Sequence, residues 1–260
     1  MRIVRFRAGG RARCGILAGN TISELYGTPF AHLGHLNSPS ILDGTTYLLD
    51  EVRLLSPCLP SKIICLGLNY RSHIEEMKLP MPSVPLIFLK PSTAVIGHEE
   101  KIILPRGWDR IDFEGELGVV VGKKARNVPE EKTGEYILGY TCFNDVSDRR
   151  AQAADGQWTR AKGYDTFAPI GPWIETEADP NNLKIETYLN GELRQSASTS
   201  DLLFGVSKLI NFISGIMTLL PGDVIATGTP SGVGSMKPGD VVEVKIQDIG
   251  TLKNFVVSPD

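Results

Sequence analysis

Long apolar runs and paired cysteines are both missing from this sequence. No run approaches the ~18 apolar residues that a membrane-spanning helix needs. The N-terminus carries arginines at positions 2, 5 and 7 and has no apolar segment behind them, which is not typical of a signal peptide. The four cysteines are widely spaced and form no Cys-x-x-Cys pair, which argues against a disulfide framework and a zinc ribbon. We therefore expect a cytoplasmic protein with reduced thiols and no membrane partner.

An excess of positive charge is missing too. The 27 Lys and Arg residues face 30 Asp and Glu residues, so the formal net charge is -3 and nucleic acid is not an expected partner. The arginines near the N-terminus alternate with Ile3, Val4 and Phe6, which is typical of an edge strand with a basic outer face. A DNA-binding role for these arginines, with salt-sensitive association, is the weakest alternative.

Strand and turn signals dominate the sequence and divide it in two. Residues 1–55 contain short alternating segments between Gly-Gly, Gly-Asn and Asp-Gly turns, and a Pro-rich crossing follows at 56–61. We predict a small β-rich N-terminal domain over residues 1–56 and a larger domain over residues 57–260. Further strands are expected at 84–90, 101–104, 114–121, 136–144, 184–189, 223–227 and 241–246.

Helix signals are fewer. A long helix is expected from Asp201 to about Leu220, because apolar residues recur there with helical spacing, Ser200 or Asp201 can cap its start, and a Pro-Gly pair follows. Shorter helices are expected at 72–77 and 147–154. Because strands and helices do not alternate strictly, we predict an α+β fold on a curled, mostly antiparallel sheet. The sequence leaves open whether the long helix lies in the core or at an interface.

Acidic residues alternate along one predicted strand, residues 111–122. Side chains alternate across a strand, so Asp112, Glu114 and Glu116 should leave the same face. Gly115 lets another chain or a ligand approach closely. Like charges at this spacing are tolerated either in water or around a cation, so the alternative to a metal site is a half-solvated acidic strand.

A third carboxylate is placed to join the two glutamates. Asp145 closes a buried strand before a helical turn, well placed to meet Glu114 and Glu116. Three carboxylates with no Cys or His among them are hard oxygen ligands, which suit Mg²⁺ or Mn²⁺ and not zinc.

Two other segments carry candidate catalytic groups. His73 and Glu76 share a face if residues 72–77 are helical, and the glutamate can then orient the imidazole as a general base. The alternative is an exposed helix with an ordinary intrahelical pair. Lys162 lies in an aromatic, turn-rich loop, where it can neutralise a carboxylate or protonate an enolate; the alternative is a surface lysine.

Six short motifs occur in a fixed order from about residue 60 to the end of the chain. They are Gly67-Leu68-Asn69-Tyr70 with His73 and Glu76, Pro85-Leu86-Ile87-Phe88-Leu89-Lys90-Pro91, Asp112-Phe113-Glu114-Gly115-Glu116-Leu117, Asn144-Asp145-Val146-Ser147, Lys162-Gly163-Tyr164-Asp165-Thr166-Phe167 with Gly171-Pro172, and Thr227-Gly228-Thr229-Pro230. In this combination the chain resembles the fumarylacetoacetate hydrolase superfamily. The resemblance implies a mixed β-sandwich roll and a homodimer, with an N-terminal unit like that of bacterial isomerase/decarboxylase members.

The resemblance also implies a role for each candidate site residue. It implies metal ligands for Mg²⁺ or Mn²⁺ at Glu114, Glu116 and Asp145, a catalytic dyad of His73 and Glu76 on a mobile lid, a catalytic Lys162 facing the substrate, and substrate contacts from Arg149, Gln152 and Thr229. The neighbours of Arg149 here are Asp148 and Arg150, whereas many relatives carry Ala before it and Asp after it.

These roles predict an enzyme that acts on a small 2-oxo or 2,4-dioxo acid. We place C–C bond hydrolysis of an acylpyruvate or fumarylpyruvate first. The alternatives are decarboxylation of an oxaloacetate-type acid, isomerisation or decarboxylation of a 5-carboxymethyl-2-hydroxymuconate type, and a non-catalytic ligand-binding protein.

Overall fold

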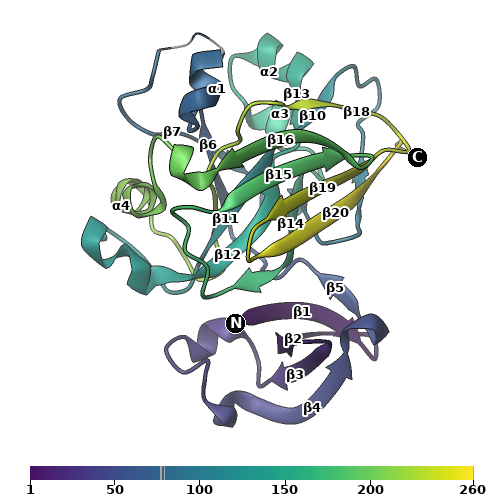
Figure 1. The fold of residues 1–260 in the computed structure, drawn as a ribbon, viewed down its shortest axis with the longest axis vertical. Helices are drawn as coiled ribbons and strands as arrows, with labels where there is room; N and C mark the ends of the chain where they lie inside the picture. Colours follow the sequence, from purple (N-terminus) through teal and green to yellow (C-terminus); the bar gives the residue numbers. More distant parts are fainter. Residues whose placement is uncertain (77, 79, 260) are drawn as a thin grey trace.

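The first five strands form a small antiparallel sheet at one end of the molecule. The structure is a computed structural model that describes residues 1–76, 78 and 80–259, without the Glu76 side chain. The strands are β1 (Arg2–Ala8), β2 (Arg11–Ala18), β3 (Thr21–Leu25), β4 (Leu42–Leu48) and β5 (Arg53–Leu55), in the order β4-β3-β2-β1 with β5 also paired to β1. Val4, Phe6, Leu17 and Ile22 make its small core. Figure 1 shows this unit beneath the larger body.

The large sheet continues directly from the small one. Strand β1 pairs antiparallel with β14 (Ala168–Glu175), so that Ile3 lies opposite Ile174. The full order is β4-β3-β2-β1-β14-β12-β11-β17-β6-β7, and β8 also pairs with β14. The remaining strands of this sheet are β6 (Ile63–Gly67), β7 (Leu86–Lys90), β8 (Val95–Ile96), β11 (Gly115–Val121), β12 (Ile137–Asn144) and β17 (Val224–Ala226).

A five-stranded sheet packs on the large one and closes the main core. Its order is β16-β15-β19-β20-β9, and the smaller third sheet has the order β13-β10-β18. Leu117 and Val119 of β11 share one buried cluster with Ile185 of β15 and Val244 of β19, so the two sheets form a sandwich. These strands are β9 (Lys101–Ile103), β10 (Ile111–Phe113), β13 (Ser147–Asp148), β15 (Lys184–Leu189), β16 (Glu192–Ser198), β18 (Gly234–Met236), β19 (Val241–Ile246) and β20 (Gly250–Val257). The predicted α+β fold is confirmed.

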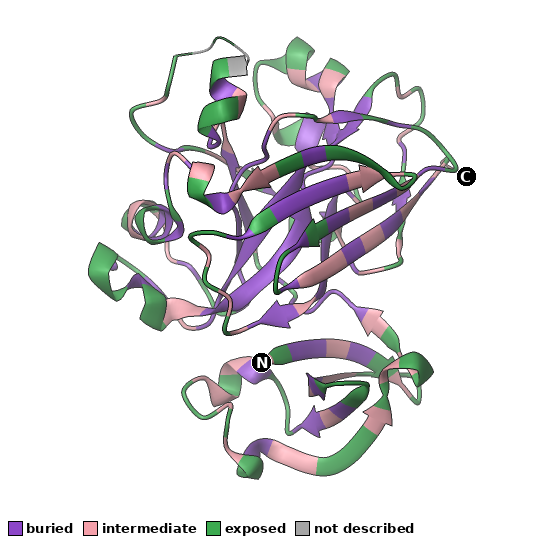
Figure 2. Ribbon diagram, viewed as in Figure 1, coloured by how far each residue is buried: buried purple, intermediate pink, exposed green. Residues whose placement is uncertain are grey.

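Helices are short and cover one end and one side of the sandwich (Figures 1 and 2). They are α1 (Arg71–Glu76), α2 (Arg149–Asp155), α3 (Thr159–Lys162) and α4 (Val206–Ile216), with 3₁₀ turns at Pro29–His32, Pro39–Ile41, Leu49–Glu51, Ser92–Ala94, Glu130–Tyr136 and Thr199–Asp201. Within the described residues, none of the helices has the length and apolar character needed to cross a membrane. Helix α4 packs one face on the core, where Leu209, Ile210 and Ile213 are buried in the main cluster, while Ser207, Lys208 and Ile216 on its other face are exposed.

The long helix predicted from Asp201 to Leu220 is wrong at both ends. Before α4, the backbone N–H groups of Leu203 and Phe204 bind Asn69, so they do not join a helix. After α4, Leu219 exchanges two backbone hydrogen bonds with Ala125. Tertiary hydrogen bonds thus shorten a helix that the apolar spacing alone would extend.

The strand predicted over residues 114–121 is β11, but its extension to a single strand over residues 111–122 is wrong. The chain breaks at Glu114 between β10 in the third sheet and β11 in the large sheet. Asp112 therefore lies outside the group of three carboxylates, although Arg149 binds both Asp112 and Glu114. The expected close approach at Gly115 does occur, because a Cβ atom there would lie 2.0 Å from the hydroxyl of Thr187 on β15.

Candidate active site

Three carboxylates converge where β10, β11 and β12 meet. Gly115 pairs with Asn144 in the β11–β12 register, and the N–H of Asp145 donates to the carbonyl of Glu114 over 2.8 Å. This pairing brings the end of β12 beside the start of β11. One oxygen each from Glu114, Glu116 and Asp145 lies within 4.8 Å of the others, and all three residues are buried. The arrangement matches the convergence that the sequence predicts.

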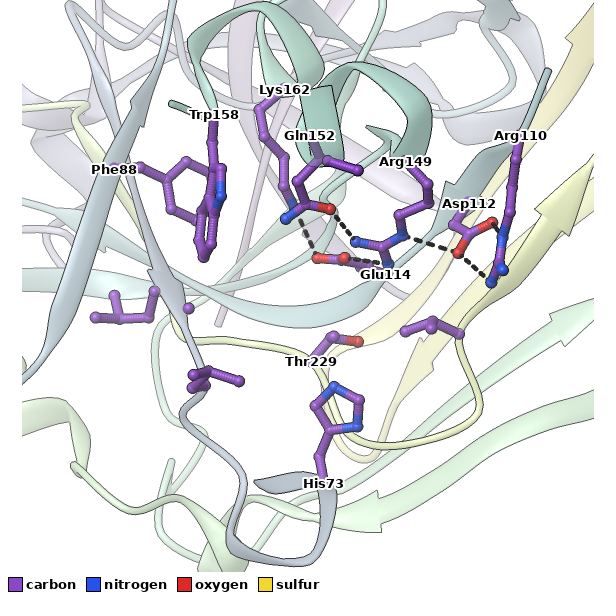
Figure 3. A pocket seen from close by; sticks show the side chains of 15 residues that line it. His73, Phe88, Arg110, Asp112, Glu114, Arg149, Gln152, Trp158, Lys162 and Thr229 are labelled. Atoms are coloured by element: carbon purple, nitrogen blue, oxygen red, sulfur yellow. Dashed lines mark hydrogen bonds and ion pairs between the residues drawn. The ribbon is translucent and has the colours of Figure 1, made fainter. Parts of the chain in front are cut away.

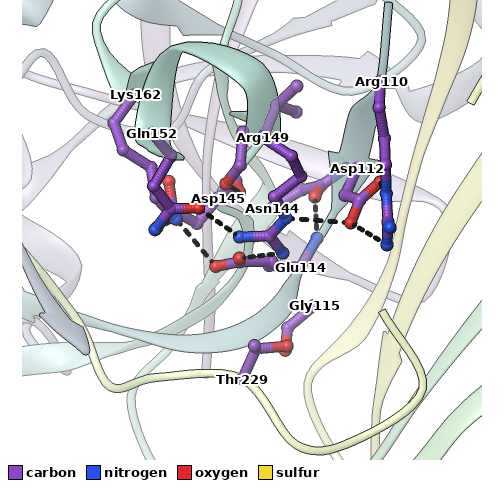
Figure 4. A network of polar contacts seen from close by, with 12 residues as sticks. Arg110, Asp112, Glu114, Gly115, Asn144, Asp145, Arg149, Gln152, Lys162 and Thr229 are labelled. Carbon is purple, nitrogen blue, oxygen red and sulfur yellow. Dashed lines mark hydrogen bonds and ion pairs between the residues drawn. The ribbon is translucent and has the colours of Figure 1, made fainter. Parts of the chain in front are cut away.

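Cations surround two of these carboxylates (Figure 4). The Nζ atom of Lys162 lies 2.9 Å from Oε2 of Glu114 and 2.7 Å from Oδ2 of Asp145. Nη2 of Arg149 lies 2.5 Å from Oε1 of Glu114. Burial alone would raise the pKa of Glu114, but Lys162 and Arg149 outweigh it and lower that pKa to about 2. Burial would likewise lower the pKa of Lys162, but Asp145 and Glu114 raise it, so the lysine stays charged.

Glu116 differs from its two neighbours. Its Oε2 accepts a hydrogen bond from the N–H of Gly228 over 2.7 Å, whereas its buried Oε1 has no hydrogen-bond partner among the described residues. Burial, and then the charges of Asp145 and Glu114, raise the pKa of Glu116 well above its usual range. A buried carboxylate with an unused oxygen beside two others fits a hard divalent cation that takes oxygen ligands.

A cavity of about 510 Å³ lies against this cluster (Figure 3). Among the predicted site residues, those that line it are His73, Glu114, Arg149, Gln152, Lys162 and Thr229. Glu116 and Asp145 are buried and are not part of the lining. The side chain of Glu76 lies outside the described residues, so the His73–Glu76 dyad stays a prediction.

The predicted substrate contacts come from two segments. Arg149 and Gln152 lie in α2, and Nη1 of Arg149 donates to Oε1 of Gln152 over 2.8 Å. The side chain of Asp148 caps this helix by accepting from the N–H of Ala151. The hydroxyl of Thr229 already donates to the carbonyl of Gly115 over 3.0 Å and accepts from Nε2 of Gln195 over 2.8 Å. Its predicted substrate contact would therefore use the remaining lone pair of the hydroxyl oxygen or rearrange one of these two bonds.

Sequence reasoning missed Lys90. This fully buried residue ends β7, and its Nζ binds Oδ1 of Asp145 and the carbonyl of Val146. Lys90 ends the apolar stretch Leu86–Lys90 just before Pro91. Because a buried lysine needs an acidic partner, this position could have indicated a buried ion pair from the sequence. Asp145 thus lies between two lysines.

Two other features of the cavity wall were also missed. At one end, Asp112 accepts from Nε and Nη2 of Arg110, each over 2.9 Å, and from Nε of Arg149 over 2.8 Å. At the other end, Phe88 and Trp158 pack edge to face with ring centroids 5.1 Å apart. The cavity therefore has a charged end and an aromatic end.

Known protein families and solved structures are similar to this chain along its length. A family model described as "Fumarylacetoacetate (FAA) hydrolase C-terminal" matches residues 62–257, and one described as "Rv2993c-like, N-terminal" matches residues 1–57. A solved 5-carboxymethyl-2-hydroxymuconate delta-isomerase from Mycobacterium smegmatis is 43% identical with a TM-score of 0.92 and covers 100% of both chains. A fumarylacetoacetate hydrolase from Exiguobacterium antarcticum is 36% identical with a TM-score of 0.89, again over 100% of both chains. The mitochondrial oxaloacetate tautomerase Fahd2a of Rattus norvegicus is 41% identical over 220 residues, which is 80% of this chain and 70% of the relative.

Proposed function

Because this chain belongs to the fumarylacetoacetate hydrolase family, we propose that it is a divalent-metal-dependent enzyme acting on 2-oxo or 2,4-dioxo carboxylic acids. The observation that carries the proposal is the buried cluster of Glu114, Glu116 and Asp145 against a cavity that also holds Lys162 and His73. A bound Mg²⁺ or Mn²⁺ supplies Lewis-acid stabilisation of an oxyanion at such a site.

The protein's own side chains can do the rest of the chemistry. Lys162 places a fixed positive charge at the floor of the cavity, where the keto oxygen gains negative charge. His73, from α1, supplies an imidazole that can take a proton from the adjacent carbon and return it. Arg149 and Gln152 lie on the same wall and can hold the carboxylate next to the keto group.

We place keto–enol proton transfer first among the possible reactions. This reaction needs only proton movement beside a stabilised oxyanion, a step that the other candidate reactions also use. In addition, relatives at 43% and 41% identity are named isomerase and tautomerase. C–C hydrolysis of an acylpyruvate or fumarylpyruvate, the reaction placed first from sequence, is the second candidate, and the 36% identical hydrolase favours it. It additionally needs His73 to activate a water. The homodimer stays a prediction.

The metal-dependent mechanism is tested with Glu116→Gln. Glu116 makes no ion pair with any residue that the structure describes. The variant keeps the size of this side chain but removes one of the three carboxylates, so turnover should fall about 100-fold or more. Turnover of oxaloacetate, acetylpyruvate, fumarylpyruvate and 5-carboxymethyl-2-hydroxymuconate is followed by NMR with Mg²⁺, Mn²⁺ or EDTA. Loss of the enol signal without carbon release identifies proton transfer, release of pyruvate from an acylpyruvate identifies hydrolysis, and release of CO₂ identifies decarboxylation.

The matched control is Glu24→Gln, a buried glutamate in the small N-terminal sheet that pairs with Arg13. It should keep wild-type turnover. Full activity of wild-type protein in EDTA, or of Glu116→Gln with metal, would rule out the metal-dependent mechanism. Inactivity of wild-type protein on every substrate would favour a ligand-binding role.

A further inference from the structure

Arg110 is a second arginine at the charged end of the cavity. It precedes β10, lines the cavity, and leaves 57% of its side chain exposed. Its Nε and Nη2 bind the two oxygens of Asp112, whereas its Nη1 has no acceptor among the described residues. Figure 3 shows Arg110 and Asp112 at the opposite end of the row of charged side chains from Lys162, with Arg149 and Glu114 between them. Arg110 can therefore donate to a ligand without releasing Asp112.

Arg149 is far less available for a second ligand group. Each of its three guanidinium nitrogens already has an acceptor, which is Asp112 for Nε, Gln152 for Nη1 and Glu114 for Nη2, so only the second N–H groups of Nη1 and Nη2 are left for the carboxylate beside the keto group. Its side chain is also only 22% exposed. Asp112 is fully buried and already paired with Arg149, so Arg110 is not needed to neutralise it. Arg110 is therefore the more exposed of the two arginines that bind Asp112, and it lines the cavity.

The charges of the whole cluster point to a substrate with two negative charges. Four cations, namely Lys90, Arg110, Arg149 and Lys162, stand against four carboxylates, namely Asp112, Glu114, Glu116 and Asp145. A divalent cation adds two positive charges to this balanced set. A ligand with two carboxylates restores neutrality in a site where unbalanced buried charge is costly.

The aromatic end of the cavity does not offer a second charged contact. The cation next to these rings is Lys162, whose Nζ lies 5.0 Å from the centroid of the Phe88 ring and already binds Glu114 and Asp145. A second carboxylate near these rings would lose its hydration without gaining a partner. Arg110 lines the same cavity two ion pairs away from Glu114, through Asp112 and Arg149, and among the described residues of the lining it is the more exposed arginine.

We propose that Arg110 is a specificity-determining residue that binds the distal carboxylate of a dicarboxylic 2-oxo acid. This inference rests on the proposed function and names its substrate class: the enzyme prefers dicarboxylic over monocarboxylic 2-oxo acids of equal length. Arg110 contributes a charge-assisted hydrogen bond at the cavity rim, remote from the reacting carbon.

The test compares binding of 2-oxoadipate and 2-oxohexanoate, which have the same chain length and differ in the distal carboxylate. Dissociation constants are measured by calorimetry on the intact protein with saturating Mg²⁺. Wild-type protein should bind 2-oxoadipate about tenfold more tightly or better, as expected for one hydrogen bond to a charged group. In Arg110→Gln the ratio of the two constants should fall to near one.

The matched control is Arg160→Gln. Arg160 is 58% exposed and pairs with Asp155 through Nε and Nη2, as Arg110 pairs with Asp112, but it does not line this cavity. In Arg160→Gln the ratio of the two dissociation constants should stay at the wild-type value. Equal binding of both acids by wild-type protein, or an unchanged ratio in Arg110→Gln, overturns the role of Arg110 and leaves the proposed function standing. Binding of neither acid, together with no turnover of any 2-oxo acid, overturns both.

Discussion

At the scale of single residues, two buried lysines balance the carboxylates beneath the cavity. Lys162 bridges Glu114 and Asp145, and Lys90 holds the other oxygen of Asp145 from β7. Both lysine side chains are almost completely removed from water, 3% exposed for Lys162 and 0% for Lys90. Without these cations, three carboxylates within 4.8 Å of one another would repel strongly in a medium of low dielectric constant. The lysines therefore allow the cluster to exist in the folded protein before any metal binds.

Lys90→Met should reveal this role as a stability change that depends on metal. The variant leaves Asp145 with one cationic partner, so in EDTA the free energy of unfolding should fall by about 3–5 kcal/mol. Mn²⁺ supplies positive charge at the same carboxylates, so it should restore more stability to the variant than it adds to wild-type protein. Urea unfolding with EDTA and with Mn²⁺ measures both effects.

Lys62→Met is the control for this prediction. Lys62 also pairs with a buried aspartate, Asp223, but at a distance from the cluster. The Lys62→Met variant should lose stability, and Mn²⁺ should stabilise it no more than it stabilises wild-type protein. Equal gains from Mn²⁺ in the two variants would show that Lys90 does not act on the metal site.

The candidate ligands could be predicted from sequence because their signal is local. Glu114 and Glu116 flank a glycine, and Asp145 follows a strand, so their convergence needs only the β11–β12 pairing. Lys90 was missed because it meets Asp145 across 55 residues, and a pattern within one segment does not report such a contact. The same holds for Arg110, whose proposed role depends on which nitrogens of Arg149 already have acceptors.

At the scale of elements, one asparagine ties the start of α1 to two other segments. The side chain of Asn69 donates to the carbonyls of Phe204 and Thr227 and accepts from the N–H of Phe204. Asn69 itself is buried and lies two residues before α1, which carries His73. It thus fixes the point from which the predicted lid extends, while the outer side of α1 is exposed.

Asn69→Ala should loosen α1 more than the rest of the molecule. Three buried hydrogen bonds are lost, so we expect a destabilisation of about 1–3 kcal/mol and faster amide exchange in residues 70–76. Hydrogen exchange by mass spectrometry measures this directly. Asn254→Ala is the control, because its side chain also makes buried bonds, to the carbonyls of Gly97 and Glu100. Equally fast exchange of residues 70–76 in both variants would contradict an anchoring role.

Sequence patterns predicted elements well where packing and local spacing agree. Strand β15 at Lys184–Leu189 and strand β19 at Val241–Ile246 have the predicted bounds. Helix α2 begins at Arg149 and not at Ser147, because Ser147 and Asp148 pair with β10 as strand β13. The predicted helix at 201–220 fails for the same reason, since distant partners take the backbone groups at its ends.

At the scale of the whole molecule, strand β1 belongs to two cores. Alternate side chains of a strand point to opposite faces. Ile3 packs with Ile170 and Ile174 in the body of the large sheet, whereas Val4 and Phe6 pack in the small N-terminal core. The sequence predicts a small N-terminal unit from its turns, but this double use of β1 depends on the pairing with β14, which no local pattern encodes.

The shared strand predicts that both units unfold together. Ile3→Ala and Val4→Ala each remove buried methyl groups, on opposite faces of β1, at an expected cost of about 2–5 kcal/mol for Ile3 and less for Val4. Differential scanning calorimetry should show one transition for wild-type protein, and each variant should lower the temperature of that single transition. If the small sheet were independent, Val4→Ala would instead produce a separate early transition and leave the main one in place. One transition that moves in both variants means that a substitution in residues 1–56 changes the stability of the active-site domain without touching the cavity.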